Sequence, residues 1–359
     1  MNGNINFLEG DIQKACSVLI AQNSQILSDN KLLWNELNKK KENNQKKVEK
    51  LFSIFLTYIG PKQIPEISFL QKKHNQEKAH LNSIETLSIS KQNPNTFATG
   101  SHDHLIKLWD LNTFKETQLL RGHSQGVWST QFSNDGKQLL SASPDKTLII
   151  WDLNKGKPTS TLKEHLNKVY FCQYNEDNKL IASGGEDQRL IIWDTRKGTA
   201  MKIIESENKI IYNIKWSKDG NYLCTSEYGG ICKIFDAKNF NLIAQFGSYN
   251  EEERSRYVNV LELSPKNQTL TKEYEFIAHM DPIKCLNIDG EKQLLITSCR
   301  DGSARVWEAF KRQNQYSPKT IGSLIGHEEN VSSIQFVAVG GKTLLLTSSY
   351  DQKVHLFEI

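Results

Sequence analysis

Histidine and aspartate, two residue types that can act as general acids and bases, recur along this chain at fixed distances from a hydroxyl residue and an aromatic residue. The histidines are His80, His123, His165, His279 and His327. The hydroxyl residues are Thr99, Ser141, Ser183, Thr225, Thr297 and Thr347. The aspartates, each four residues after a hydroxyl, are Asp103, Asp145, Asp187, Asp301 and Asp351. The aromatic residues, each six positions after the Asp position, are Trp109, Trp151, Trp193, Phe235, Trp307 and Phe357.

This repetition favours a structural role for the four residue types over catalysis. A buried indole N–H group and a buried imidazole need hydrogen-bond partners, and a hydroxyl and a carboxylate supply them in one closed network. The fourth unit has Glu207 in place of the histidine and Gly229 in place of the aspartate, so we expect it to be the least stable regular unit. No GxxxxGK[ST], HExxH or GxSxG motif occurs. The sequence therefore predicts a protein that is not an enzyme and that needs no cofactor or metal.

The elements that position these residues are predicted to be β-strands. The first four aromatic residues are 42 positions apart, a period typical of repeat architectures. Short apolar runs such as LIIWD end at Asp152 and Asp194, and turn sequences such as NDGK at 134–137 lie between the runs. With Gly-His at 122–123 and 326–327 and Trp-Asp at 109–110, 151–152 and 193–194, residues 64–359 resemble the WD40-repeat family. The resemblance implies an all-β propeller, a ring of four-stranded blades.

The number of blades is left open by one irregular interval. Phe235 and Trp307 are 72 residues apart, which lies between one repeat and two. Residues 257–263 and 271–279 have the pattern of two outer strands, so we predict seven blades with a reduced fifth, with six blades or an error in the gene sequence as alternatives. Because the chain stops just after Phe357, the resemblance implies that a strand from the N-terminal side, residues 64–71, closes the ring of blades. The propeller domain is therefore predicted to comprise residues 61–359.

Residues 1–60 have helical rather than strand spacing. Ile12, Leu19, Ile26 and Leu33 are seven residues apart, as in a coiled coil. The stretch NKLLWNEL at 30–37 has a local resemblance to the trimerisation helix of heat-shock transcription factors. We predict a helical extension that self-associates or docks on a partner helix; the alternative is an amphipathic helix folded back on the propeller.

The resemblance also implies where partners bind. In this family the partner meets the residue after the first apolar residue of each inner strand, and the residue before the repeat aspartate. The first set here is Glu85, Trp128, Tyr170, Tyr212, Lys284 and Ser332. The second set is His102, Glu186, Tyr228, Arg300 and Tyr350. Tyrosine, tryptophan and arginine dominate interface hot spots, so we predict a protein- or peptide-binding rim. The alternative is that some of these side chains only line the channel or pack on neighbouring blades.

A second motif indicates a different partner. Asp187, Trp193, Asp194 and Arg196 resemble the WDxR box by which substrate receptors contact the adaptor of cullin-4 ubiquitin ligases. The repeat already explains the first three residues, so Arg196 alone is the candidate ligase-adaptor contact.

Composition limits the remaining classes of function. The net charge of +4 is small for 359 residues and the rim charges are mixed in sign, which argues against nucleic acid as a partner. Six cysteines without a CxxC pair fit a reduced, cytoplasmic or nuclear protein. No signal peptide and no apolar run of about 18 residues is found, so no membrane span is expected. The sequence thus predicts a non-catalytic interaction scaffold or adaptor subunit, with the ubiquitin-ligase receptor as the alternative.

Overall fold

The computed structural model describes residues 68–69, 72–76, 78–207, 209–217, 219–228, 231–246, 283–289, 294–308, 319–324, 326–339 and 342–358. The predicted N-terminal helix at 1–60 and the proposed outer strands at 257–263 and 271–279 lie outside these ranges. The chain divides into two compact units, Met1–Glu66 and Ile67–Ile359, and all the described strands belong to the second.

The described residues form six β-sheets whose strands run antiparallel to their neighbours, except that the short strand β1 (Ser68–Phe69) adds in parallel to the outer edge of the fifth sheet. The first sheet contains β3 (Ile84–Ile89), β4 (Thr96–Ser101), β5 (Leu105–Asp110) and β6 (Glu116–Arg121). The second contains β7 (Ser129–Phe132), β8 (Gln138–Ala142), β9 (Leu148–Asp152) and β10 (Lys157–Leu162). The third contains β11 (Val169–Tyr174), β12 (Leu180–Gly185), β13 (Arg189–Asp194) and β14 (Thr199–Glu205).

The other three sheets follow the same plan. The fourth contains β15 (Ile211–Trp216), β16 (Tyr222–Glu227), β17 (Ile231–Asp236) and β18 (Leu242–Phe246). The fifth contains β19 (Ile283–Asp289), β20 (Leu294–Cys299), β21 (Ala304–Glu308) and β22 (Lys319–Leu324). The sixth contains β23 (Val331–Val339), β24 (Lys342–Ser349) and β25 (Val354–Glu358), with β2 (Lys72–Gln76) as its outermost strand.

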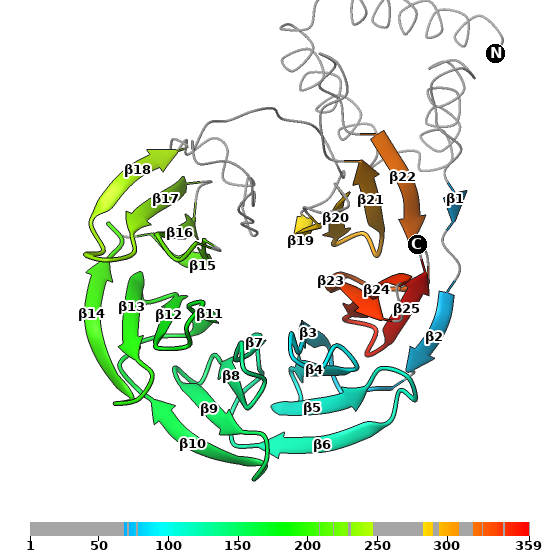
Figure 1. The fold of residues 1–359 in the computed structure, drawn as a ribbon, viewed down its shortest axis with the longest axis horizontal. Coiled ribbons are helices and arrows are strands. Elements are labelled where there is room, and N and C mark those ends of the chain that lie inside the picture. The colour runs from blue at the N-terminus through cyan, green and yellow to red at the C-terminus, as the bar shows by residue number, and fades with distance from the viewer. Residues whose placement is uncertain are drawn as a thin grey trace, which may run out of the picture. The chain divides into compact units, whose positions relative to one another are not determined.

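The sheets follow one another around a common centre, with the first strand of each sheet innermost and the last outermost (Figure 1). Neighbouring innermost strands lie side by side from β19 through β23, β3, β7 and β11 to β15. This is the radial arrangement of propeller blades. Six blades are present in the described ranges, and a seventh stays a prediction because the residues proposed for it fall outside them.

The closure of the sixth sheet corrects the predicted position of the closing strand. β2 pairs antiparallel with β25, joining Lys72 to Phe357 and Gln76 to Val354. The closing residues are therefore 72–76 and not 64–71. Within the predicted segment, β1 (Ser68–Phe69) pairs in parallel with β22 of the fifth sheet instead. The sequence KKHNQ at 72–76 is polar throughout, so it carries none of the apolar alternation on which the prediction depended.

The core lies between neighbouring sheets. Ala98 and Leu108 of the first sheet pack in one cluster with Leu139 and Trp151 of the second. The second strands are buried on both faces, as in β12, where five of six residues are buried. Burial of each large apolar side chain contributes roughly 1.5–3 kcal/mol, so these interfaces hold the ring together.

Two expectations about the chain as a whole can be compared with the described residues. The five cysteines among them form no disulfide. Among these residues there is also no helix with the length and apolar character needed to cross a membrane.

Candidate functional site

The repeated polar residues form one hydrogen-bonded network in each of the first three sheets. In the first, Nδ1 of His80 lies 2.9 Å from Oδ2 of Asp103, and Nε2 lies 2.7 Å from the Thr99 hydroxyl. The indole N–H of Trp109 donates to the same hydroxyl at 2.8 Å. Because the carboxylate can only accept, Nδ1 carries the proton, and the hydroxyl accepts from the indole while donating to Nε2.

The second and third sheets repeat this geometry closely. The His–Asp, His–Ser and Trp–Ser distances are 2.8, 2.7 and 2.8 Å in each of them. In the sixth sheet His327 contacts Asp351 at 2.9 Å and Thr347 at 2.8 Å, while Phe357 offers no N–H group. In the fifth sheet Trp307 donates to Thr297 at 2.9 Å; the predicted His279 lies outside the described residues, and Asp301 is exposed.

The aspartates of the network also fix the turns at one end of each sheet. Asp103 accepts the backbone N–H groups of Leu81 and Leu105 at 3.0 Å each. Burial alone would raise the pKa of Asp103, but the hydrogen bond from His80 and these two amides together lower it to about 2. The same balance lowers the pKa of Asp351 to about 2. The carboxylates are therefore ionised at neutral pH and act as structural acceptors.

The fourth sheet contains a different buried network, which the sequence pattern did not reveal. Glu227 and Lys233, whose side chains are 1% and 7% exposed, form an ion pair with Nζ 3.0 Å from Oε2. The Thr225 hydroxyl donates to Glu227 at 3.3 Å, and Lys233 donates to the Ser206 hydroxyl at 3.3 Å. In this blade, which lacks the histidine and the aspartate, Glu227 is thus the partner of the repeated hydroxyl of Thr225, and Lys233 is the partner of Glu227.

The predicted rim residues of the first set share one backbone feature. In β11, Val169 pairs with Gly185 and Phe171 pairs with Gly184, so Tyr170 is the extra residue of a β-bulge. The same shift in pairing occurs at Glu85, Tyr212, Lys284 and Ser332. Trp128 occupies the matching position just before β7, where its N–H donates to Ala142. A bulge re-aims the side chain it contains, which explains why these residues reach the inner rim.

Aromatic rings from neighbouring sheets form a continuous chain along this rim. Trp128 stacks on Tyr170 with centroids 4.9 Å apart, and Tyr212 meets Tyr170 edge-on at 5.2 Å. His102 contacts Trp128 at 6.3 Å on one side and Tyr350 at 6.5 Å on the other. We call these five residues the aromatic arc.

The arc stands at a central cavity of about 750 Å³. All five arc residues line this cavity, together with Glu85, Lys284 and Ser332. The other three predicted rim residues are not part of its lining: Glu186 and Tyr228 are half-buried beside it, and Arg300 is exposed. The structure therefore brings together all six residues of the first predicted set and two of the five residues of the second.

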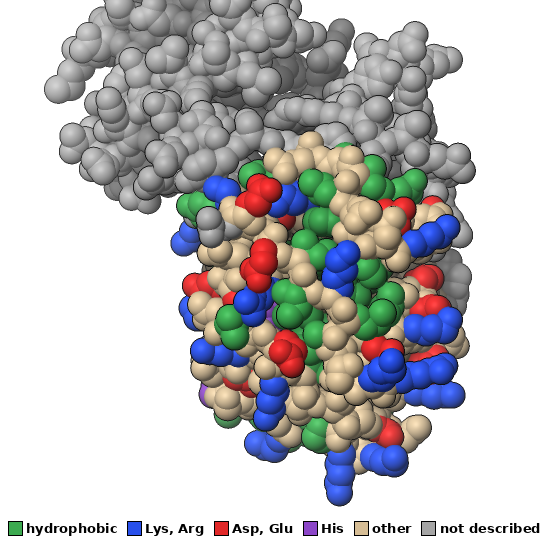
Figure 2. Space-filling model, turned by 90° about the vertical axis from the view of Figure 1, so that its left-hand side faces the viewer, with side chains coloured by type: hydrophobic (Ala, Val, Ile, Leu, Met, Phe, Trp, Pro, Cys, Tyr) green, Lys and Arg blue, Asp and Glu red, His purple; other side chains and the backbone are tan. Residues whose placement is uncertain are grey.

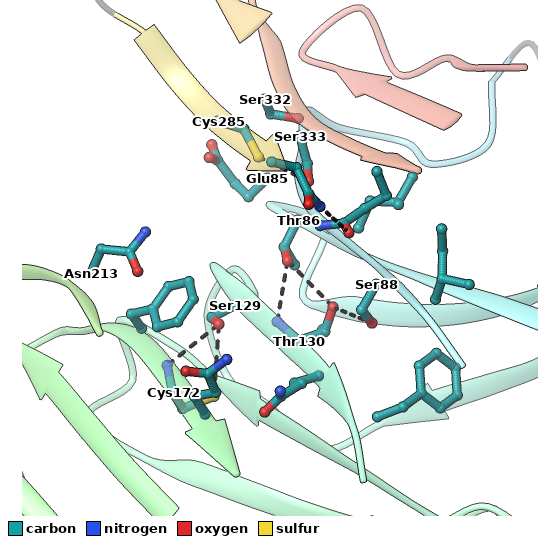
Figure 3. A pocket seen from close by; sticks show the side chains of 18 of the residues that line it. Glu85, Thr86, Ser88, Ser129, Thr130, Cys172, Asn213, Cys285, Ser332 and Ser333 are labelled. Atoms are coloured by element: carbon teal, nitrogen blue, oxygen red, sulfur yellow. Dashed lines mark hydrogen bonds between the residues drawn. The ribbon is translucent and has the colours of Figure 1, made fainter. Parts of the chain in front are cut away.

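The wall of the cavity also contains polar groups that bind one another across the blades (Figure 3). The Thr130 hydroxyl lies 3.3 Å from both the Thr86 and the Ser88 hydroxyls, and its backbone N–H donates to Thr86 at 3.2 Å. Cys172 donates its backbone N–H to the Ser129 hydroxyl. These hydrogen bonds join neighbouring blades. The groups that make them already have partners, whereas the aromatic arc presents ring surfaces that a binding partner could contact. In the described ranges no three His, Cys, Asp or Glu side chains converge as metal ligands would.

Arg196, the candidate ligase-adaptor contact, lies in an exposed turn. The Asp194 carboxylate before it accepts the backbone N–H groups of Arg196 and Lys197 at 2.9 Å each. Asp110, Asp152 and Asp236 stabilise the same turn in the first, second and fourth sheets. Asp194 therefore has a structural role common to the repeats, and only the Arg196 side chain is specific to the third blade.

Comparison with known proteins gives one match over most of the chain and two short ones. The sequence profile of "WD domain, G-beta repeat" matches residues 71–110, 114–152, 156–194, 198–236, 261–308 and 318–358. Over 60 residues the chain is 38% identical to "Non-functional target of rapamycin complex subunit LST8-2" of Arabidopsis thaliana, covering 17% of this chain and 19% of that protein. Over 61 residues it is 34% identical to "Cilia- and flagella-associated protein 52" of Mus musculus, covering 17% and 10%.

These short matches span a fifth or less of either curated relative, so they share repeats with the chain and not a whole protein. The profile match, in contrast, covers more than half of the chain, and each matched repeat ends on the strand that carries the aromatic residue. The profile, the six sheets and the hydrogen-bonded His, Ser/Thr, Asp and Trp residues agree, and the chain belongs to the WD40-repeat family.

Proposed function

We propose that this protein is a non-catalytic interaction scaffold or adaptor subunit that binds a protein partner at the mouth of the central cavity. The observation that carries the proposal is that Tyr170 and Tyr212 each stand on a β-bulge, with Trp128 at the matching position before β7, and that all three line one cavity. Three large aromatic side chains on a rigid sheet edge provide contact area at little cost in conformational entropy. One relative with a similar repeat is named as a subunit of a complex, which is the kind of role proposed here.

Loss of the central aromatic pair tests the rim. Replacing Trp128 and Tyr170 together with alanine is expected to weaken partner binding by at least about tenfold, because hot-spot truncations cost about 2 kcal/mol or more. The tagged full-length protein would be purified from its own cells, and the proteins that accompany it quantified by mass spectrometry. Both side chains are half-buried, so the variant should still fold.

The matched control removes apolar area at the outer edge of the blades instead. Met201 on β14 and Leu242 on β18 are 58% and 51% exposed. Figure 2, which views the molecule from the side of these strands, shows hydrophobic side chains among charged ones there. Met201→Ala with Leu242→Ala should leave the recovered proteins unchanged. If the Trp128 and Tyr170 variant recovered the same partner proteins in the same amounts as the natural protein, the rim would not be the binding site.

A second part of the proposal concerns residues 1–60, which we expect to set the state of association. Their seven-residue spacing of apolar side chains favours helix–helix pairing. A chain that begins at residue 61 keeps the closing strand β2 and should fold, but its mass by light scattering should be that of a smaller assembly. If the assembly contained the same number of chains with and without residues 1–60, this expectation would be wrong.

The ligase-receptor alternative has one supporting observation, the exposure of the Arg196 side chain. The purification described above also tests it. Recovery of a cullin and its adaptor that disappears with Arg196→Ala would favour a substrate receptor. Recovery of other subunits that is unaffected by Arg196→Ala favours the scaffold.

A further inference from the structure

The acidic side chains around the cavity mouth are already held by neighbouring groups. Oε1 of Glu85 lies 2.6 Å from Nε2 of His102, and Oε2 accepts a hydrogen bond from the Tyr350 hydroxyl at 3.0 Å. Both carboxylate oxygens of Glu85 are therefore occupied. Glu186 forms an ion pair with Lys168, with Oε2 and Nζ 3.2 Å apart. A basic partner side chain would have to replace these bonds in order to gain a carboxylate.

Two basic side chains of the fifth blade differ from these acids. Lys284 is the extra residue of the β19 bulge, and Arg300 directly follows β20. The pairing of Ile283 with Cys299 places the two residues at the same end of the sheet. In the part of the chain that the structure describes, neither side chain has an ion pair or a hydrogen bond, whereas other basic residues near the mouth, such as Lys168, do.

Both basic residues lie close to members of the aromatic arc. Lys284 lines the same cavity as Trp128, Tyr212 and Tyr350. Arg300 is close enough to Tyr350 for its charge to lower the pKa of that hydroxyl against the larger, raising effect of burial. The mouth thus has an apolar, aromatic side and an uncompensated basic side.

We propose that the mouth binds an acidic segment of a partner protein, with a carboxylate against Lys284 and Arg300 and an aromatic or large aliphatic side chain on the aromatic arc. This inference rests on the proposed function and names the chemistry of the partner. It follows from charge complementarity, because a partner carboxylate meets two cations that have no partner of their own, whereas a partner lysine meets acids that are already bonded.

Three synthetic peptide pools of equal length test this chemistry on the full-length protein. One pool combines Phe with Asp and Glu, the second combines Phe with Lys and Arg, and the third combines Ala with Asp and Glu. By fluorescence anisotropy, the acidic aromatic pool is expected to bind about tenfold tighter than either of the others, and more weakly as salt is added.

Charge reversal provides the decisive comparison. Lys284→Glu with Arg300→Glu should weaken binding of the acidic aromatic pool by at least about tenfold and raise that of the basic aromatic pool. The control, Lys115→Glu with Lys238→Glu, makes the same change of charge in exposed turns at the other end of the strands and should leave the ranking unchanged. Neutral Lys284→Gln with Arg300→Gln gives a second measurement if the reversed variant does not fold.

The failures of the two proposals can be told apart. If charge reversal leaves the ranking as in the natural protein, or if no pool binds, the acidic partner is overturned. If the recovery of partner proteins from cells still depends on Trp128 and Tyr170 in that case, the proposed function of the rim remains. If partners purified from cells depend on neither pair of residues, the rim function itself fails.

Discussion

Replacing Lys233 with methionine is expected to lower the free energy of unfolding by about 3–5 kcal/mol, because the Glu227 carboxylate would stay buried without its counter-charge. Glu227 is 1% exposed, and among the described residues it keeps only the Thr225 hydroxyl, 3.3 Å away, as a side-chain hydrogen-bond donor once Lys233 is gone. Methionine has nearly the length of the lysine stem, so the change removes a charge with little change in packing. Urea unfolding followed by tryptophan fluorescence measures the loss.

The double variant separates the cost of an unpaired charge from the value of the pair. Glu227→Leu with Lys233→Met should recover most of the stability lost by the single variant, since apolar replacements of buried ion pairs are often neutral or stabilising. A single variant as stable as the natural protein would mean that water reaches the Glu227 carboxylate. A double variant as unstable as the single one would mean that packing, not charge, is what Lys233 contributes.

This pair also shows why part of the molecule could not be predicted from the sequence. The network of His80, Thr99, Asp103 and Trp109 repeats at fixed offsets, so its residues could be recognised by spacing alone. Glu227 occurs at its repeat position in one blade only: the first blade has Lys107 at the position of Lys233, but Ser101 at the position of Glu227. The pair therefore has no repeat to identify it. Whether the acids and bases of the rim are paired depends on side-chain conformation, which the spacing does not encode.

The rim itself was largely predictable, for a physical reason. Tyr170 and Tyr212 each form a bulge at the same place in their inner strands, and Trp128 holds the matching position before β7, so the three residues are 42 positions apart. The closing strand was misplaced because an outermost strand faces water and needs no apolar residues. The aromatic arc joins residues from five sheets, and its contacts only become evident in three dimensions.

Removing the Thr99 hydroxyl alone is expected to destabilise the first blade by about 2–6 kcal/mol. Thr99→Val keeps the shape of the side chain but leaves Nε2 of His80 and the indole N–H of Trp109 without a partner, each at a cost of about 1–3 kcal/mol. The site is fully buried, so water cannot replace the hydroxyl without rearrangement. The loss would be measured by urea unfolding. In a hydrogen-exchange experiment, the protected backbone amides of β3 to β5 should become exchangeable before those of the other blades.

Thr99→Ser is the matched control for this change, because serine occupies the same position in the second and third blades, at Ser141 and Ser183. It removes a methyl group but keeps the hydroxyl, which accepts from the indole and donates to the imidazole in those blades at 2.8 and 2.7 Å. We therefore expect Thr99→Ser to be clearly more stable than Thr99→Val. If the two variants were equally unstable, the methyl group and not the hydrogen-bonded network would hold this blade together.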